Sequence, residues 1–574
     1  MNKKQIVHFL EEIAIYLEIK GENPFKVAAY RKAALSLETD ERSLGQIGDL
    51  SKLKGIGKGT AAVIQELVET GSSTLLEELR EEIPSGLLNL LKIPGLGAKK
   101  IAKLHQKLGI TDLDSLKLAC EKKEVRTLEG FGDITEEKLL KAIGDLTTRP
   151  ERLPIAYMLT IAGQIEKVLI TLDIIEQFSR AGSLRRHRET MKDLDFVIAT
   201  TAPGTASETL LQTLAVKEVV GHGETKLSLI LNDEFQIGVD FRFVHPDEFA
   251  TALHHFTGSK SHNVLMRRLA KSRGEKISEY GVETEDGRRL TFPSESAFFE
   301  HFGLAFIPPE CREGLDELEQ AHKKMPLHLI QENQIKSDLH MHTTSSDGAN
   351  TLEEMAEAAI LKGYEYIAIT DHSKSLRVAN GLTEERLRAQ HQKINELNKK
   401  YKGKLHIFSG VEMDILPDGR LDYEDDLLEE LDFVIAAIHS SFSQSEDQIM
   451  HRLESAMRHP KVRLIAHPTG RIIGRRTVYR VNLERLIDLA AETGTALELN
   501  ANPHRLDLSA EWLKSSREKG VKVCINTDAH SLDGLDHMSI GVSYGKRAWL
   551  SPEDVINTYS LAAFIAFLET KKPF

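Results

Sequence analysis

The sequence predicts a multidomain α/β protein with a helical N-terminal region, a mixed α+β middle and a C-terminal barrel of alternating strands and helices. Three observations support this fold class. Apolar residues recur at helical spacing through residues 1–145, strand-like runs occupy residues 194–244, and seven strand-like runs alternate with helical segments after residue 335. A chain of 574 residues has room for about three to five domains, each with its own core.

The composition is that of a globular protein. Apolar residues make up 41% and charged residues 28%, which excludes a fibrous or mainly disordered chain. No apolar run is long enough for a membrane span, and the N-terminus does not resemble a secretory signal. Only three cysteines occur, far apart and without a CxxC pair, so we expect a cytoplasmic protein with no disulfide and no thiolate zinc site.

The N-terminal region repeats one kind of turn. Helical spacing predicts helices over Gln5–Leu17, Thr60–Glu69 and Lys99–Leu108, and an apolar residue followed by Gly-apolar-Gly recurs between helices. The glycine pairs are Gly55 and Gly57, Gly95 and Gly97, and Gly130 and Gly132. The net charge of −13 does not favour nucleic-acid binding, but uncharged backbone N–H groups at a helix start can bind DNA phosphates. For a single copy, a plain helical turn is the simpler interpretation.

The middle of the chain carries three carboxylates on predicted strands. A helix over Ile161–Ser179 precedes strand-like runs at Leu194–Ala199, Leu227–Leu231 and Gln236–Val244. Asp193 and Asp195 share one face of a strand, and Asp240 lies on a later strand that can pair with it. Three adjacent carboxylates repel one another unless cations intervene, which is the arrangement for two Mg²⁺ ions in phosphoryl transfer.

Two further stretches of this region suit phosphate. Gly182, Ser183 and Arg186 precede the carboxylates and offer backbone amides, a hydroxyl and a guanidinium to a polyphosphate. A basic stretch follows the Phe256–Lys260 turn, and its alternative interpretation is a solvated helix face. Its cations are Lys260, Arg267, Arg268, Lys271, Arg273 and Lys276.

The C-terminal region places histidines and carboxylates at strand ends. The predicted strands are Ile335–His342, Tyr366–Thr370, Leu405–Val411, Phe433–Ile438, Val462–Ala466, Ala496–Leu499 and Val521–Thr527. Strand C-termini meet at one rim of an α/β barrel, where active sites lie. Nine nitrogen or oxygen ligands there would hold two or three divalent metals. Imidazole and carboxylate suit manganese, zinc or iron, of which we expect Mn²⁺ or Zn²⁺. These candidates are His340, His342, Asp347, His372, Glu412, His439, His467, Asp528 and His530.

These motifs resemble the PHP (polymerase and histidinol phosphatase) phosphoesterase superfamily. The matching stretches are 338–342, 370–372, 410–412, 438–440, 466–468 and 526–530. The resemblance implies a distorted (β/α)7 barrel with a trinuclear site. It also implies one metal on His340, His342, Glu412 and Asp528, a second on Glu412, His439 and His467, and a third on Asp347, His372 and His530.

Residues 1–320 resemble the family X DNA polymerases related to polymerase beta. The resemblance implies an α+β nucleotidyltransferase palm in which Asp193, Asp195 and Asp240 bind Mg²⁺ or Mn²⁺ and Asp240 helps to deprotonate the primer hydroxyl. Gly182, Ser183, Arg186, Arg149, Phe256, Gly258 and Asn263 would bind the nucleotide. The glycine pairs would be helix-hairpin-helix motifs, of which Gly55, Gly57, Gly95 and Gly97 bind DNA together with Arg267.

The resemblance also divides the chain. It implies a small helical DNA-binding domain at 1–80, a helical DNA-binding subdomain at 81–150, a palm at 151–245, a nucleotide-selecting subdomain at 246–320, a linker at 321–334 and a PHP domain at 335–574. The charged segment from Glu313 to Gln334 is predicted to connect the halves.

Two positions depart from the polymerase beta pattern. His255 stands where relatives often have tyrosine beside the sugar, which leaves ribonucleotide exclusion open. The segment Gly71–Leu76 lacks the Schiff-base lysine of animal relatives, which argues against lyase activity. Lys26, Tyr30 and Lys32 suit a DNA 5′-phosphate, or equally a solvated helix face.

The joined halves resemble a bacterial or archaeal family X polymerase with a PHP tail. We therefore expect a DNA polymerase that fills short gaps in repair and a 3′–5′ exonuclease, with implied abasic-site endonuclease and 3′-end cleaning activities. The expected partners are gapped or nicked DNA and dNTPs, with no membrane, and the expected state is a monomer. The alternatives are a small-molecule PHP phosphatase with a DNA-docking N-terminal half, and a DNA-binding scaffold with idle sites.

Overall fold

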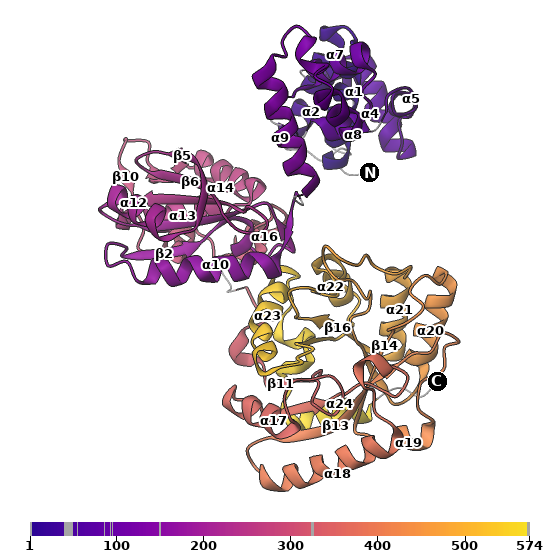
Figure 1. Cartoon of the computed structure of the whole chain (residues 1–574). Coiled ribbons are helices and arrows are strands. Elements are labelled where there is room, and N and C mark those ends of the chain that lie inside the picture. The colour runs from indigo at the N-terminus through magenta and orange to yellow at the C-terminus, as the bar shows by residue number, and fades with distance from the viewer. Residues whose placement is uncertain are drawn as a thin grey trace. The chain divides into compact units, whose positions relative to one another are not determined.

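A computed structural model of the chain describes residues 3–39, 50–53, 55–84, 86–91, 93, 96–148, 151–322 and 327–570 (Figure 1). The chain divides into two compact units, Met1–Glu151 and Arg152–Phe574. In these described ranges, no helix is both long and apolar enough to cross a lipid bilayer.

The first unit is helical, as predicted, and its helices bury a common core. Its helices are α1 (Lys3–Lys20), α2 (Pro24–Thr39), α4 (Lys58–Thr70), α5 (Thr74–Glu82), α6 (Gly86–Leu90), α7 (Ala98–Leu108), α8 (Leu113–Glu121) and α9 (Asp133–Thr148). Gly57 and Gly97 are the N-cap residues of α4 and α7, and α9 follows Gly132. The Gly-x-Gly turns thus precede helices, which is the geometry expected of phosphate-binding hairpins.

A mixed five-stranded sheet forms the first part of the second unit. Its elements are β1 (Leu153–Pro154), α10 (Ile155–Ile170), β2 (Gln177–Arg180), α11 (Gly182–Arg185), β3 (Thr190–Met191), β4 (Asp193–Ala199), α12 (Pro203–Thr213), β5 (Val216–His222), β6 (Lys226–Leu231) and β7 (Gly238–Val244). The strand order is β2-β4-β7-β6-β5, and only β4 and β7 are parallel.

The predicted helix over Ile161–Ser179 is wrong beyond Ile170. Residues 177–180 form β2 instead, which pairs with β4 so that Phe178 lies opposite Ile198. Tertiary pairing along the edge of the sheet therefore overrides the local helical pattern.

Residues 246–322 form a smaller subdomain. Its main elements are α13 (Phe249–Thr257), α14 (Lys260–Ser272), β8 (Lys276–Ser278), β9 (Gly281–Glu283), β10 (Arg289–Leu290), α15 (Glu295–His301) and α16 (Glu317–His322). Glu317 is fully buried and accepts a hydrogen bond from His262 Nδ1 at 3.0 Å. The first part of the predicted connection, from Glu313, therefore packs into this subdomain.

The last part of the second unit is a nearly closed barrel of seven parallel strands, as predicted. The strands are β11 (Ser337–Asp338), β12 (Tyr366–Ile369), β13 (His406–Asp414), β14 (Phe433–Ala437), β15 (Val462–Ile465), β16 (Ala496–Asn500) and β17 (Val523–Asn526), paired in chain order. A bridge between Met341 and Ala529 brings the two ends of the sheet together, and His342 N donates to Ala529 O at 2.9 Å.

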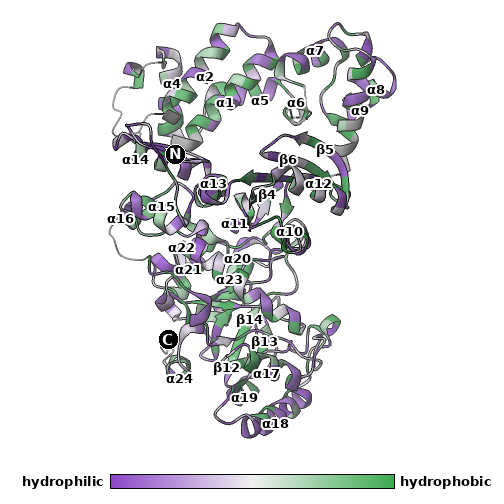
Figure 2. Ribbon diagram, turned by 90° about the vertical axis from the view of Figure 1, so that its left-hand side faces the viewer, coloured by the Kyte–Doolittle hydropathy of each residue, from purple (hydrophilic) through white to green (hydrophobic). Residues whose placement is uncertain are grey.

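The barrel helices are α17 (Leu352–Leu361), α18 (Glu384–Lys400), α19 (Asp425–Glu429), α20 (Glu446–Arg458), α21 (Leu483–Thr493), α22 (Ala510–Glu518), α23 (His537–Arg547) and α24 (Leu561–Glu569). Hydrophobic residues line β13 and β14, whereas α18 is largely hydrophilic (Figure 2). Phe564 of α24 packs against Tyr366 and Phe433 at the starts of their strands. Helix α24 thus covers the starts of these strands, which leaves the strand ends available for a site.

A buried charge network stabilises the subdomain at 246–322. Arg312 is fully buried, and its Nη1 donates to Glu295 Oε1 at 2.5 Å while Arg185 Nη2 donates to Glu295 Oε2 at 2.5 Å. Burial opposes ionisation of Glu295, but the charge of Arg312 and the hydrogen bond from Arg185 hold its pKa down at about 2.

We predict that Arg312→Leu lowers the free energy of unfolding by about 3 kcal/mol, because it leaves a buried carboxylate without one of its partners. Urea unfolding followed by the fluorescence of Trp549, which packs on this subdomain, measures the change in a Trp512→Phe background. The folded pKa of Glu295 lies below its unfolded value of about 4.3. The loss of unfolding free energy caused by Arg312→Leu should therefore shrink as the pH falls below that value.

The matched control is Arg288→Leu, since Arg288 pairs with Asp286 at the surface. Equal unfolding midpoints for the two variants would contradict the assignment of the Arg312–Glu295 pair as a main support of this subdomain.

Candidate functional site

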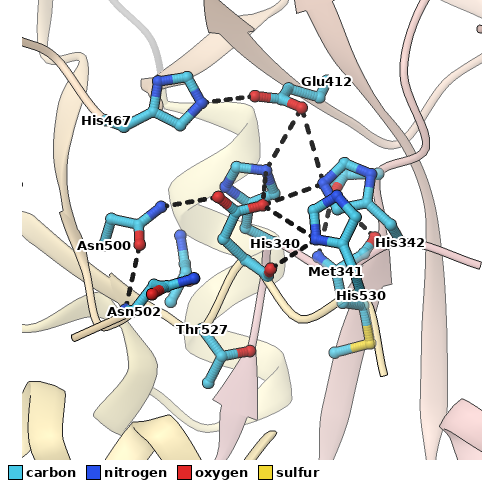
Figure 3. A network of polar contacts seen from close by, with 12 residues as sticks. His340, Met341, His342, Glu412, His467, Asn500, Asn502, Thr527 and His530 are labelled. Atoms are coloured by element: carbon cyan, nitrogen blue, oxygen red, sulfur yellow. Dashed lines mark hydrogen bonds and ion pairs between the residues drawn. The ribbon is translucent and has the colours of Figure 1, made fainter. Parts of the chain in front are cut away.

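The barrel gathers all nine predicted ligands at its strand ends. Five of them, His340, His342, Glu412, His467 and His530, are labelled in Figure 3 and lie close to one another. His340 and His342 follow β11, His372 follows β12, and Glu412 lies within β13. His439, His467, Asp528 and His530 follow β14, β15 and β17, and Asp347 lies in the loop after His342. The parallel strands therefore carry these side chains to a single rim.

Three overlapping groups within this rim have metal-binding geometry. The groups are His342, Asp347, His372 and His530; His340, His342 and Glu412; and His372, Glu412 and His439, each with ligand atoms within 4.8 Å of one another. His467 Nε2 lies 2.8 Å from Glu412 Oε1, and Asp528 Oδ1 lies 3.2 Å from His342 Nε2. These groups share members with the partition implied by the resemblance but differ in detail, since His342 also approaches Asp347.

Unsatisfied atoms at the centre of the ring suit cations. His340 Nε2, both ring nitrogens of His342 and Glu412 Oε2 are buried without a hydrogen bond. Both His340 Nε2 and His342 Nε2 lie 3.6 Å from Glu412 Oε2. Burial opposes ionisation of Glu412, but the surrounding imidazoles, His439 first, hold its pKa well below its usual value. Buried nitrogen and carboxylate oxygen atoms left without hydrogen bonds are the donor set that Mn²⁺ or Zn²⁺ prefers.

Glu498 supports the ring from behind and was missed by the sequence analysis. Its Oε1 accepts from His340 Nδ1 at 2.8 Å, and its Oε2 accepts from the backbone N–H of His467 at 2.6 Å. Glu498 is fully buried on β16. A single glutamate inside an apolar strand was the available signal, because such a carboxylate is rarely buried unless paired. The contact fixes the His340 tautomer so that Nε2 faces the ring.

The palm brings its three carboxylates together. Asp193 and Asp195 lie on β4, and the parallel pairing with β7 places Asp195 directly opposite Asp240. Burial and then the charges of Asp240 and Asp193 raise the pKa of Asp195 to about 6. Lys226 Nζ lies 2.8 Å from Asp240 Oδ2 and partly offsets the negative charge. A trio of this kind is a hard-oxygen site suited to Mg²⁺ or Mn²⁺.

Two glycines lie where the chain passes close to the carboxylates. Gly182 has φ = +55°, and a Cβ there would lie 2.0 Å from Asp195 Oδ2. A Cβ on Gly238 would lie 2.5 Å from Asp193 Oδ1. The start of α11, with Gly182 and Ser183, therefore lies directly beside the carboxylate trio.

The predicted nucleotide residues lie on two segments that touch. Arg186 donates through Nη1 to the carbonyl oxygen of Thr257, beside Gly258. Asn263 Nδ2 donates to His255 O at 2.7 Å, while its Oδ1 is buried without a hydrogen bond. Phe256 packs under Arg242, whose guanidinium carbon lies 4.8 Å from the ring centre. Arg242 was not singled out from the sequence, although it lies two residues after Asp240 on the same strand face. Arg149 lies outside the described residues.

The predicted DNA-binding residues differ in accessibility. A Cβ on Gly57 or Gly97 would meet nothing within 4 Å, so both helix starts are open to a ligand, whereas Gly55 (φ = +105°) packs on Ser36. Gly95 lies outside the described residues.

On α2, Lys26 is exposed and pairs with Glu22, but Tyr30 is only 6% exposed. Tyr30 therefore does not fit a solvated helix face. Arg267 lies on α14, and its Nε donates to Asn263 O at 3.3 Å.

We predict that Glu498→Gln weakens Mn²⁺ binding to the barrel by about 10- to 100-fold, because the neutral amide no longer orients His340. Titration calorimetry with Mn²⁺ measures this in a chain whose Asp193 and Asp195 are replaced by alanine, so that the barrel alone contributes. Glu492→Gln, at an exposed glutamate of α21, is the control. Unchanged affinity in Glu498→Gln would refute the supporting role.

Four family models match parts of the chain. They are described as a helix-hairpin-helix domain (residues 1–73), a SAM-like helix-hairpin-helix tandem (87–145), a DNA polymerase beta thumb (252–313) and a PHP domain (338–502). The thumb match contains Phe256, Gly258, Asn263 and Arg267, and the PHP match ends before Asp528.

Curated proteins resemble part of the chain or the whole of it. A probable phosphatase of Thermoanaerobacter sp. (strain X514) is 28% identical over 41% of this chain and 95% of its own length. A probable phosphatase of Caldanaerobacter subterraneus subsp. tengcongensis is 30% identical over 38% of this chain and 86% of its own length. The Bacillus subtilis (strain 168) protein named DNA polymerase/3'-5' exonuclease PolX is 55% identical over 99% of this chain and 100% of its own length. Together with the two sites described above, this full-length identity shows that the chain belongs to the PolX family of family X DNA polymerases with a C-terminal PHP domain.

Proposed function

We propose that this chain is a template-directed DNA polymerase that fills short gaps during repair, and that its barrel hydrolyses DNA 3′ ends as a 3′–5′ exonuclease. The observation that carries the proposal is the carboxylate trio on β4 and β7, packed against the Gly182 turn in a chain that also holds a nine-ligand ring. Both sites suit divalent metals and phosphate, as nucleotide addition and the hydrolysis of DNA 3′ ends each require.

The palm residues have separable roles in nucleotide addition. Asp193, Asp195 and Asp240 would hold two Mg²⁺ or Mn²⁺ ions, which offset the charge on the triphosphate and lower the barrier to in-line displacement. Asp240, opposite Asp195, receives the proton of the primer 3′-hydroxyl. Gly182 and Ser183 offer backbone and hydroxyl donors to the triphosphate, and Arg186 neutralises its charge.

The subdomain at 246–322 selects the nucleotide and grips the template. Phe256 and Gly258 line the sugar pocket, Asn263 meets the base edge through its unpartnered amide oxygen, and Arg267 contacts the template strand. The open helix starts at Gly57 and Gly97 bind backbone phosphates on both sides of a gap without reading sequence. On α2, the exposed Lys26 would receive a 5′-phosphate, and the largely buried Tyr30 lies one turn further along the same helix face. The chain would act as a monomer on gapped or nicked DNA with dNTPs.

In the barrel, the ring from His340 to His530 would bind two or three divalent metals, Mn²⁺ or Zn²⁺, which supply a nucleophilic hydroxide and stabilise charge on the scissile phosphate. Glu412 approaches two of the three ligand groups and so ties the ring into one centre. Asp347 and His530, on the exposed side of the ring, face the incoming phosphate.

The two activities should separate by mutation. We predict that Asp193→Ala with Asp195→Ala lowers gap filling by at least about 10³-fold, since about 4 kcal/mol of charge stabilisation is lost, and leaves the nuclease intact. His340→Ala with His342→Ala should do the reverse. Primer extension on a one-nucleotide gap and release of 3′-labelled nucleotide, each with Mn²⁺, measure the two activities. A palm double variant that still extends the primer would remove the basis for the polymerase assignment.

A second candidate activity is hydrolysis of a small phosphate ester, because relatives that align with 41% and 38% of this chain are named probable phosphatases. The same ring could also cleave at abasic sites or clean blocked 3′ ends. We predict that the wild-type chain releases nucleotides from a DNA 3′ end at least about tenfold faster, in kcat/KM, than it releases phosphate from p-nitrophenyl phosphate, because DNA adds binding energy outside the ring. A preference for the small ester, without nucleotide incorporation, would favour the phosphatase.

A further inference from the structure

The barrel holds the segment of the palm that carries the proposed triphosphate ligands. This segment, Gly182–Glu189, contains α11 and the turn that leads to β3. Both belong to one compact unit, and residues of the barrel contact the segment at two points.

The first contact involves Arg547, the last residue of α23. Its Nη1 donates to the carbonyl oxygen of Arg186 at 3.1 Å and to Glu313 Oε1 at 2.8 Å. The same Glu313 oxygen accepts from Arg186 Nε at 3.0 Å. The side chains of Arg547, Arg186 and Glu313 are 11%, 12% and 21% exposed, so solvent screens these charges little. Arg547 thus contacts Arg186 both directly and through Glu313.

The second contact lies three residues beyond Arg186. Glu189 accepts from Arg471 Nη2 at 2.9 Å and from the hydroxyl of Tyr544. Tyr544 and Arg547 lie three residues apart on α23, so one face of this helix reaches both Glu189 and Arg186. The segment is therefore fixed at two places by a helix of the other catalytic domain.

These contacts matter because the segment has little support of its own. Its helix α11 has only four residues, Gly182–Arg185, and His187 has a positive φ of 50°. A short helix followed by an unfavourable backbone conformation needs outside contacts to keep one geometry. The guanidinium of Arg186 must also be aimed at the triphosphate while Glu313 and Thr257 hold it.

We propose that α23 of the barrel is a structural part of the polymerase nucleotide site, with Arg547 as a positioning residue that orients Arg186 directly and through Glu313. This inference rests on the proposed polymerase function and adds that the nuclease domain supports nucleotide binding without contacting the nucleotide.

The test compares Arg547→Met with wild type in single-nucleotide gap filling. We expect KM for the dNTP to rise at least about tenfold, as for the loss of one charged hydrogen bond, with a much smaller change in kcat. Arg547→Lys, which retains the charge and one donor, should recover part of the loss. Arg485→Met on α21, where Arg485 is an exposed arginine of the same domain, is the matched control.

Two further measurements separate positioning from damage to the fold. Exonuclease activity should stay at the wild-type level in Arg547→Met, because Arg547 lies at the end of α23 about 15 Å along the helix from the end nearest the ring. Backbone hydrogen exchange over residues 182–189 should quicken in Arg547→Met but not in Arg485→Met. A joint Glu313→Gln and Arg547→Met variant should lose less than the sum of the two single variants, because both act on Arg186.

Each outcome decides the inference. Unchanged KM and exchange in Arg547→Met, with normal gap filling by wild type, would overturn the positioning role and leave the proposed function standing. A loss of exonuclease activity in parallel with gap filling would show general damage and also overturn it. Wild-type protein that binds and incorporates no dNTP would instead overturn the proposed function, and this inference with it.

Discussion

The parallel register between β4 and β7 is the constraint on which the polymerase site depends. It sets Asp195 opposite Asp240 at the spacing of paired strands, and Asp193 lies on the same face two residues away. Gly182 and Gly238 then pass so close that a Cβ on either would force a carboxylate oxygen of Asp195 or Asp193 to move. Burial, and then the like charges that the sheet holds together, raise the pKa of Asp195, a cost that divalent cations would reverse.

The barrel also holds its candidate metal ligands close together, but most of them are imidazoles rather than carboxylates. Its parallel strands end at one rim, and the buried imidazoles and Glu412 converge there with several atoms left without hydrogen bonds. Glu498 and its neighbours fix the ring nitrogens from behind, which lowers the cost of ordering them when metal binds. The palm trio is more exposed, as suits a site that must admit and release a nucleotide and a DNA end at each cycle, whereas most of the ring is buried.

Much of the architecture could be predicted from the sequence, because its signals are local. Strand ends followed by histidine or aspartate predicted the barrel and the gathering of its candidate ligands at one rim, and Asp-x-Asp with a later strand aspartate predicted that the three carboxylates lie together. Signals that depend on tertiary contact were missed. The sequence of β2 continues a helical pattern, and only its pairing with β4 makes it a strand. Glu498 forms its hydrogen bonds only when β16 lies beside His340 and His467. The contacts of Arg547 with Arg186 and Glu313 join positions more than 200 residues apart, which no local pattern reveals.

The central claim is that one chain builds two separate metal centres, one from carboxylates for adding nucleotides and one from imidazoles for removing them. Anomalous diffraction at the manganese edge, from crystals of the full chain soaked in Mn²⁺ and a non-reactive dNTP, tests it most directly. The account predicts peaks between Asp195 and Asp240 and a separate group of peaks among His340, His342 and Glu412. Absence of density from either position at saturating Mn²⁺, or metal bound only at unrelated surface carboxylates, would contradict it.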